Sequence, residues 1–241
     1  MLITGASRGI GAAIAVAAAA DHDLVLTHTG AAQIDGLTAS LEEAGAAVVV
    51  VVGDVADESH VVDVFRRTDE RFGRVDVIVN NAGIAGGYGG VETMSGEMLR
   101  RLFDVNVVGA FLCAREAAKR MSTANGGHGG SIINISSKAA VLGGSTEWVH
   151  YAASKGAIDT MTIGLSKELA AVGIRVNGVR PGLIESDFHL HAPPGRVERM
   201  APIILMQRSG SAAEVAAAVI WLASAAASYV TGACIDVTGG R

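Results

Sequence analysis

The sequence predicts an α/β fold of the Rossmann type, a doubly wound parallel sheet of about seven strands with helices on both faces. Short β-branched runs alternate with longer alanine-rich segments of helical spacing, which is the pattern of βαβ units. The runs are apolar throughout instead of alternating in polarity, as strands covered on both faces are. A glycine-rich segment also follows the first run and precedes the first helical segment.

The expected strands account for seven runs of the sequence. In chain order they are LITG (2–5), LVLTH (24–28), AVVVVV (47–52), VDVIVN (75–80), SIINIS (131–136), IRVNGVR (174–180) and CIDVTG (234–239). Neither an internal repeat nor a proline- or serine-rich linker divides the chain, so we expect one domain, residues 1–241. Residues 185–200 are the expected substrate loop, because ligands bind beyond the carboxyl ends of the strands in such sheets.

Composition excludes several classes of partner. The formal net charge is -5 and the basic residues do not cluster, so the sequence lacks the footprint of a nucleic-acid-binding protein. The longest apolar runs are far shorter than the roughly 20 residues of a membrane span. Cys113 and Cys234 lack zinc-ligand spacing, which predicts free thiols and no metal site. Because the N-terminus carries no secretion signal, we expect a cytoplasmic protein whose partner is a small molecule.

The glycine-rich segment TGASRGIG (4–11) predicts a dinucleotide site. Glycine tolerates positive φ and lets a diphosphate approach the backbone, while the N–H groups at the start of the following helix attract the anion. The position of the segment, between the first strand and the first helix, favours this role over an ordinary turn. The expected contacts are Gly5, Ser7, Arg8, Gly9, Ile10 and Gly11.

The end of the second strand indicates which form of the cofactor is bound. NAD-selective sites place Asp or Glu there to bind the ribose hydroxyls, but this chain has His28 and Thr29. Arg8 instead offers a guanidinium that can meet a 2′-phosphate. We therefore expect NADP as the preferred cofactor, with NAD as the alternative.

Two further strand ends carry candidate cofactor contacts. After the third strand, Asp54 is placed to accept from the adenine amino group, and Val55 follows it. Asp57 is better placed than Asp54 to cap the next helix. The fourth strand ends in NNAG (80–83), whose amides serve either the cofactor or a turn. The contacts expected from it are Asn81, Ala82 and Gly83.

Tyr151 and Lys155 form the candidate proton-transfer centre, because at i and i+4 they share one helix face. A free phenol has a pKa of about 10, which an adjacent ammonium and an oxidised nicotinamide are expected to lower. Two serines end the preceding strand. We expect Ser137 to polarise a substrate carbonyl and Ser136 to satisfy the backbone. For the Tyr151/Lys155 pair alone, the alternative is a packed aromatic beside a surface lysine.

Four motifs, TGASRGIG, NNAG, a serine followed by YxxxK, and RPGLIES (180–186), resemble in order and spacing those of the short-chain dehydrogenase/reductase family. The resemblance runs from the first strand to YVTGACIDVTGG (229–240). It implies that Tyr151 is the catalytic acid/base, that Ser137 polarises the substrate and that Lys155 holds the nicotinamide ribose. It also implies that Asn106 kinks its helix and anchors a water in a proton relay. The nicotinamide contacts that it implies are Pro181, Gly182, Ile184 and Ser186.

The implied reaction is hydride transfer between nicotinamide and a carbonyl or secondary alcohol carbon. Two segments, SKGAIDTMTIGLSKELA and YVTGACIDVTGG, are similar to bacterial oxidoreductases named as sugar or glucose dehydrogenases. A sugar or polyol is therefore the first candidate substrate, and a 3-oxoacyl thioester is the second. A non-catalytic, dinucleotide-binding regulatory protein would share the fold, but the intact set of candidate catalytic residues argues against it. The resemblance, together with an apolar surplus in segments 97–121 and 151–173, predicts a homotetramer.

Overall fold

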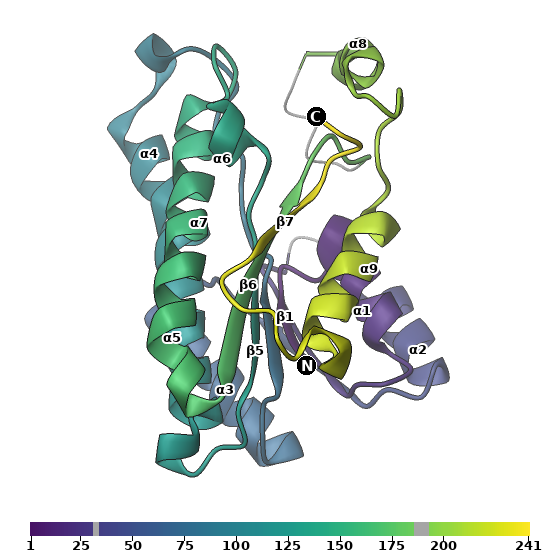
Figure 1. The fold of residues 1–241 in the computed structure, drawn as a ribbon, viewed down its shortest axis with the longest axis vertical. Coiled ribbons are helices and arrows are strands. Elements are labelled where there is room, and N and C mark those ends of the chain that lie inside the picture. The colour runs from purple at the N-terminus through teal and green to yellow at the C-terminus, as the bar shows by residue number, and fades with distance from the viewer. Residues whose placement is uncertain (31–33, 186–192) are drawn as a thin grey trace.

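The sheet of the protein is parallel and seven-stranded, with the order β3-β2-β1-β4-β5-β6-β7 (Figure 1). The structure is a computed structural model and describes residues 1–30, 34–185 and 193–241. Its strands are β1 (Leu2–Thr4), β2 (Leu24–His28), β3 (Val48–Val52), β4 (Val77–Asn80), β5 (Gly130–Ile135), β6 (Ile174–Pro181) and β7 (Cys234–Val237). All seven expected strands are thereby confirmed, with ends that lie within two residues of the expected ones.

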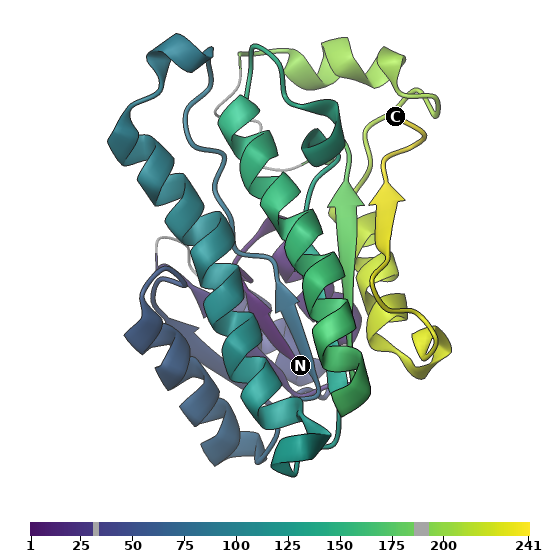
Figure 2. The same ribbon diagram turned by 60° about the vertical axis from the view of Figure 1, so that its left-hand side comes forward.

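Helices cover both faces of the sheet, which confirms the doubly wound fold (Figures 1 and 2). One face carries α1 (Gly9–Ala18), α2 (Asp35–Glu43) and α9 (Ala212–Ala223). The other face carries α3 (Glu58–Phe72), α5 (Gly109–Met121) and α7 (Val149–Leu169). The shorter helices α4 (Gly96–Phe103), α6 (Ala139–Leu142) and α8 (Arg196–Met200) gather at the end of the molecule toward which the strands run.

Neighbouring strand residues enter different cores, because side chains alternate across a sheet. Leu2 belongs to the apolar cluster beneath α3, α5 and α7, whereas Ile3 belongs to the cluster beneath α1 and α9. Both side chains are fully buried. Each strand therefore needs apolar residues at successive positions, and this need explains why the strands appear as unbroken apolar runs in the sequence.

The start of α3 follows the expected capping pattern. Asp57 is its N-cap, and the carboxylate accepts a hydrogen bond from the backbone N–H of Ser59 at 2.8 Å. Gly73 ends the helix with a φ of 73°, a conformation in which most other residues are strained. Because Asp57 caps the helix, Asp54 belongs to the loop between β3 and α3.

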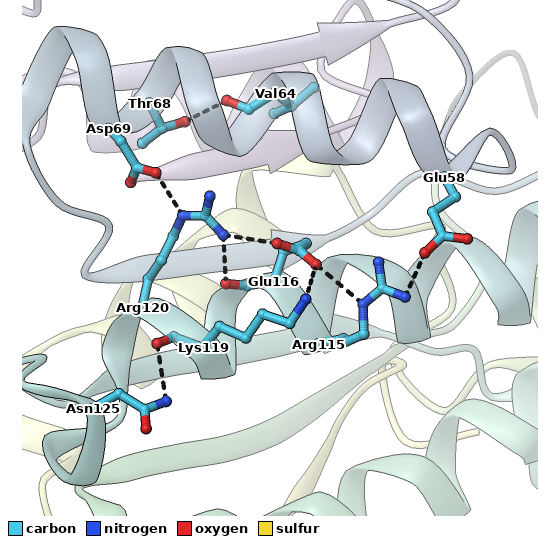
Figure 3. A network of polar contacts seen from close by, with 9 residues as sticks. All are labelled: Glu58, Val64, Thr68, Asp69, Arg115, Glu116, Lys119, Arg120 and Asn125. Atoms are coloured by element: carbon cyan, nitrogen blue, oxygen red, sulfur yellow. Dashed lines mark hydrogen bonds and ion pairs between the residues drawn. The ribbon is translucent and has the colours of Figure 1, made fainter.

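A polar network joins α3 to α5 on the outer side of the sheet (Figure 3). Its centre is the Glu116 side chain, which is buried. The donors to this carboxylate are Arg115, Lys119 and Arg120, at 3.1, 2.7 and 2.8 Å. Arg120 also donates to Asp69 of α3 at 2.8 Å, and Arg115 donates to Glu58 of α3 at 2.6 Å. The carboxylate is thus buried together with the cations that compensate its charge.

Two observations limit other kinds of site in the described ranges. None of the helices there is long and apolar enough to cross a membrane. Over the same ranges, no group of three or more His, Cys, Asp and Glu side chains is arranged to hold a metal ion. Cys113 and Cys234 are both free thiols.

Candidate active site

A cavity of about 350 Å³ opens where the carboxyl ends of the central strands meet the glycine-rich loop. This is the crevice in which open α/β sheets bind ligands. Nearly all the residues expected from the sequence to form the site line it. They are Gly5, Ser7, Arg8, Gly9, Ile10, His28, Thr29, Asp54, Val55, Asn81, Ala82, Gly83, Ser137, Tyr151, Lys155, Pro181, Gly182 and Ile184. Ser186 lies outside the described residues.

The glycine-rich loop is built from close backbone contacts. Gly5 has a φ of 64°, and a Cβ at this position would lie 2.9 Å from the Cα of Ala82. Gly11 lies behind the loop instead of lining the cavity, since a Cβ there would lie 2.4 Å from the carbonyl oxygen of Gly5. Gly11 therefore lets α1 pack against the loop. Gly5 lets the loop adopt a positive φ and pass close to Ala82 where it lines the cavity.

The NNAG segment holds the glycine-rich loop in place. The Asn81 side-chain amide donates to the carbonyl oxygens of Thr4 and Gly5, at 2.9 and 3.0 Å. In return, the Thr4 hydroxyl accepts from the backbone N–H groups of Asn81 and Ala82, both at 3.0 Å. The ends of β1 and β4 are thus tied together, which leaves a preformed wall of backbone beside the cavity.

The part of the cavity at the end of β2 is lined by Thr27, His28 and Thr29, none of which is acidic. His28 is buried, and its Nδ1 accepts from the backbone N–H of Gly30 at 3.0 Å. Arg8 stands at the N-cap of α1, where an anion is favoured. Asp54 accepts from the backbone N–H of Ala56 at 2.9 Å and from the Nη2 of Arg101, a cavity-lining residue that the sequence did not indicate, at 2.5 Å.

Tyr151, Lys155 and the ends of β5 form the opposite side of the cavity. The Lys155 side chain is 5% exposed, and its Nζ donates to the carbonyl oxygen of Ile135 at 2.7 Å. The same nitrogen lies 5.8 Å from the centre of the Tyr151 ring. Ser136 is buried and donates to the carbonyl oxygen of Lys155 at 3.1 Å, which agrees with the backbone role expected of it.

Burial dominates the electrostatics of this pair. It raises the pKa of the Tyr151 phenol to about 12, and a hydrogen bond with Ser137 acts in the opposite direction. Burial lowers the pKa of the Lys155 ammonium to about 8, against the pull of the Asp159 charge. In the chain by itself the loss of water around the phenol outweighs its favourable contacts. The expected lowering of the phenol pKa includes the charge of an oxidised nicotinamide and therefore stays a prediction for the cofactor-bound protein.

The Ser137 hydroxyl bonds to two neighbours just beyond the end of β5 among the described residues. Its hydroxyl oxygen accepts from the backbone N–H of Ala139 at 3.1 Å and forms the hydrogen bond with Tyr151 that stabilises the phenolate. The hydroxyl therefore lies beside the phenol oxygen in the cavity wall. An oxygen atom of a substrate bound between Ser137 and Tyr151 is within reach of both hydroxyls.

Asn106 lies in a π-helical turn, Asp104–Val108, between α4 and α5. Its amide accepts from the N–H of Ile84 at 2.8 Å and donates to the carbonyl oxygen of Ile84 at 2.9 Å and to the Ser154 hydroxyl at 3.0 Å. A Cβ at Gly83 would lie 3.2 Å from the Asn106 Oδ1 and 3.4 Å from the Lys155 Nζ. Both polar groups therefore face Gly83, although no direct hydrogen bond joins them among the described residues.

Two loops and the first residue of α8 meet at a cluster that we call the aromatic clasp, formed by Tyr88, Glu147, Trp148 and Arg196. The Trp148 ring is buried, with its centre 5.2 Å from that of Tyr88 in an edge-to-face arrangement. The Arg196 guanidinium lies 4.8 Å from the centre of the Trp148 ring and donates to the Glu147 carboxylate at 2.7 Å. Glu147 and Arg196 carried no recognisable signal in the sequence, because 49 residues separate them.

His150 lies beside the aromatic clasp, one residue before Tyr151. It is buried, and within the described part of the chain neither ring nitrogen has a hydrogen-bond partner. A Cβ at Gly86 would lie 2.8 Å from its Nε2. The imidazole therefore fills the space beneath the loop of residues 84–90 and does not line the cavity.

Comparison with known proteins identifies the class of this site. Residues 5–241 match a family model described as enoyl-(acyl carrier protein) reductase. An uncharacterized oxidoreductase of Escherichia coli strain K12, YgfF, is 47% identical over 246 residues, which cover 100% of this chain and 98% of the relative. An L-rhamnose 1-dehydrogenase (NAD(P)(+)) of Sphingomonas sp. strain SKA58 is 37% identical, over 100% of this chain and 94% of the relative.

Other relatives are also similar over nearly the whole length of the chain. A 3-oxoacyl-[acyl-carrier-protein] reductase of Synechocystis sp. strain PCC 6803 is 35% identical, over 99% of this chain and 95% of the relative. The crystal structure of a blue fluorescent protein from a metagenomic library, in complex with NADPH, superposes with a TM-score of 0.90 at 34% identity. The superposition covers 99% of this chain and 96% of the other. The chain therefore belongs to the short-chain dehydrogenase/reductase family of NAD(P)-dependent oxidoreductases.

Proposed function

We propose that this protein is an NADP-preferring oxidoreductase that interconverts a carbonyl and a secondary alcohol group on a sugar or polyol, with Tyr151 as its acid/base. One observation carries the catalytic part of the proposal. The Ser137 hydroxyl, the Tyr151 phenol and the Lys155 ammonium line the same cavity as the glycine-rich loop. A substrate oxygen and a dinucleotide can therefore occupy adjacent parts of one space.

Each catalytic group has a distinct task in this proposal. Ser137 donates a hydrogen bond to the substrate oxygen and holds it beside Tyr151, which exchanges a proton with that oxygen. Lys155, held by the Ile135 carbonyl, places a positive charge beside the phenol and favours its deprotonated form. Asn106 anchors a water that passes protons to Lys155 from the side of Gly83. When bound, the nicotinamide supplies the hydride donor or acceptor.

We propose the dinucleotide contacts as they were expected from the sequence. Gly5, Ser7, Gly9 and Ile10 contact the diphosphate, with Gly11 supporting them from behind. Arg8, with His28 and Thr29, surrounds the 2′-phosphate, and the lack of an acidic group at the end of β2 supports NADP over NAD. Asp54 and Val55 contact adenine. The nicotinamide contacts complete the set and are Asn81, Ala82, Gly83, Pro181, Gly182, Ile184 and Ser186.

The substrate is proposed from the relatives. A sugar or polyol is supported by the likeness to the L-rhamnose dehydrogenase, and a 3-oxoacyl thioester by the likeness to the acyl-carrier-protein reductase. We place the sugar or polyol first because the segments around Lys155 and β7 resemble sugar dehydrogenases. Residues 185–200 form the substrate loop in this proposal, and residues 186–192 of it lie outside the described residues.

We propose a cytoplasmic homotetramer with a single domain in each chain. Apolar side chains exposed on two parts of the surface support self-association. Val108, Phe111 and Ile163 are 44%, 46% and 44% exposed on the π turn, α5 and α7, which lie side by side in Figure 2. Trp221 on α9 is 42% exposed, and Tyr229 near β7 is fully exposed. Exposed apolar patches of this kind mark protein–protein contacts.

A substrate panel tests the proposal. Sugars, polyols, diketones and 3-oxoacyl thioesters are each incubated with the purified protein and NADP(H) or NAD(H), and the absorbance of reduced nicotinamide is followed. We expect turnover of a sugar or polyol with a higher kcat/KM for NADP than for NAD. Turnover restricted to thioesters would overturn the substrate, and tighter binding of NAD than of NADP would overturn the role of Arg8. A monomer in light scattering would overturn the tetramer.

A further inference from the structure

Arg101 reaches the dinucleotide cavity from α4, a helix that the sequence motifs leave without a role in the site. Its Nη2 donates to the Oδ2 of Asp54 at 2.5 Å, and both residues line the cavity. The side chains of Arg101 and Asp54 are 47% and 33% exposed. Because an ion pair this exposed contributes little to folding stability, its position in the cavity wall suggests a role toward a ligand.

The backbone around Arg101 holds the guanidinium over Asp54. Arg101 and Val105 both line the cavity, and Gly109 follows them along the same helical segment. A Cβ at Gly109 would lie 2.8 Å from the Cγ2 of Val55 and 2.9 Å from its carbonyl oxygen. The helical segment is therefore in direct contact with the loop that carries Asp54, so Arg101 approaches that loop from a packed element.

Asp54 and Arg101 together offer an acceptor and a donor side by side. The Oδ1 of Asp54 accepts from the N–H of Ala56 at 2.9 Å, which orients the carboxylate. Each carboxylate oxygen still has a lone pair beyond the bond that it makes. Arg101 has five N–H donors, and within the described ranges its one hydrogen-bond acceptor is Asp54. Donors on the guanidinium and acceptors on the carboxylate thus remain for a ligand.

This pattern is complementary to an adenine edge. Adenine presents the N6 amino donor next to the N7 acceptor, whereas a 6-oxo purine presents an oxygen acceptor in place of the amino group. We propose that Arg101 is an adenine-binding residue that, with Asp54, selects adenine over 6-oxo purines at the adenosine end of the cofactor. The inference rests on the proposed function of the cavity as a dinucleotide site.

Dissociation constants test the inference without turnover. The purified protein is titrated with NADPH and with its hypoxanthine analogue, and nicotinamide fluorescence reports binding. For the unmodified protein we expect the hypoxanthine analogue to bind about 10-fold more weakly or worse, since its 6-oxygen faces the Asp54 carboxylate. Arg101→Gln should weaken NADPH binding about 10-fold. It should also reduce the ratio of the dissociation constant of the hypoxanthine analogue to that of NADPH.

Two controls separate adenine recognition from a general disturbance. Arg100→Gln makes the same charge change one residue away on α4, at an exposed position that does not line the cavity, and should leave both constants unchanged. Reduced nicotinamide mononucleotide lacks adenosine, so its binding should be the same in the unmodified protein and in Arg101→Gln. Loss of mononucleotide binding in Arg101→Gln would show a structural role and overturn the inference.

The remaining outcomes are equally decisive. If Arg101→Gln weakens NADPH and the hypoxanthine analogue by one common factor, Arg101 acts through its charge and does not read the base. If neither constant changes, Arg101 has no part in binding. Failure of the unmodified protein to bind NADPH or NADH would instead refute the proposed function itself, and is thereby distinguishable from failure of the Arg101 inference.

Discussion

The Nζ of Lys155 lies 5.8 Å from the centre of the Tyr151 ring while it donates a 2.7 Å hydrogen bond to the Ile135 carbonyl at the end of β5. The helix spacing of four residues brings the two side chains to one face, and the strand end fixes the lysine there. The ammonium is therefore placed by two elements at once, α7 and β5. This arrangement leads to the first two predictions.

Tyr151→Phe should lower kcat on the best substrate of the panel by about 100- to 10,000-fold, the usual contribution of a general acid/base. The phenyl ring keeps the packing, so the dissociation constant for NADPH should stay within a factor of about two. Tyr229→Phe is the matched control, because Tyr229 is fully exposed and does not line the cavity. Full turnover by Tyr151→Phe would exclude the proton role.

Lys155→Met should change how stability depends on pH. Burial lowers the Lys155 pKa from 10.5 to about 8, so between these values the unfolded chain binds more protons than the folded one. The unmodified protein should therefore gain about 2 kcal/mol in unfolding free energy relative to Lys155→Met when the pH rises from about 7 to about 9.5. Urea unfolding at the two pH values measures this difference.

The control for this measurement is Lys167→Met, which removes an exposed lysine from the same helix. The difference in unfolding free energy between the unmodified protein and Lys167→Met should be the same at both pH values. A pH-independent difference for Lys155→Met as well would mean that the ammonium is not destabilised by burial.

Arg196→Met should open the aromatic clasp. The substitution removes the ion pair with Glu147 and the cation–π contact with Trp148, so α8 loses these two contacts with the residues just before α7. We expect KM for the substrate to rise about 3- to 30-fold while kcat and the NADPH dissociation constant change little. Arg199→Met, on the same short helix but bonded to the Pro194 carbonyl, is the control. Equal KM values for the two variants would argue against the clasp.

Glu116→Gln should destabilise the fold by about 1–3 kcal/mol near neutral pH, because a buried charge-assisted network loses its central acceptor. Burial opposes the charge of Glu116, but the bonds from Lys119 and Arg120 prevail and lower its pKa below 4.5. Its contribution is therefore present above about pH 4.5 and is lost as the pH falls through the lowered folded pKa.

The difference in unfolding free energy between Glu116→Gln and the unmodified protein should thus become smaller in acid. Urea unfolding at pH 7 and in mild acid can measure this change. Glu58→Gln removes an exposed carboxylate of the same network and should cost less than about 1 kcal/mol. A difference in unfolding free energy that stays constant as the pH falls would contradict the assigned role of the Glu116 charge.

Local patterns made much of the molecule predictable from the sequence. The strands follow from apolar runs, and the residues of the glycine-rich loop and the Tyr151/Lys155 face follow from short spacings on single elements. Arg101 was missed because its partner Asp54 is 47 residues away, and no periodic pattern marks such a contact. The rise of the Tyr151 phenol pKa in the chain by itself could not be predicted either, because burial of the phenol depends on the assembled fold.

The π turn at Asp104–Val108 has a consequence for how the chain tolerates change. One residue more per turn rotates everything that follows by about 100° relative to a continuous α-helix. The segment before the turn can therefore direct Arg101 into the cavity, while the segment after it directs Arg120 toward Asp69 of α3. Deleting a single residue here would force the two halves into one helical phase, and either the cavity wall or the contact with α3 would lose its side chains.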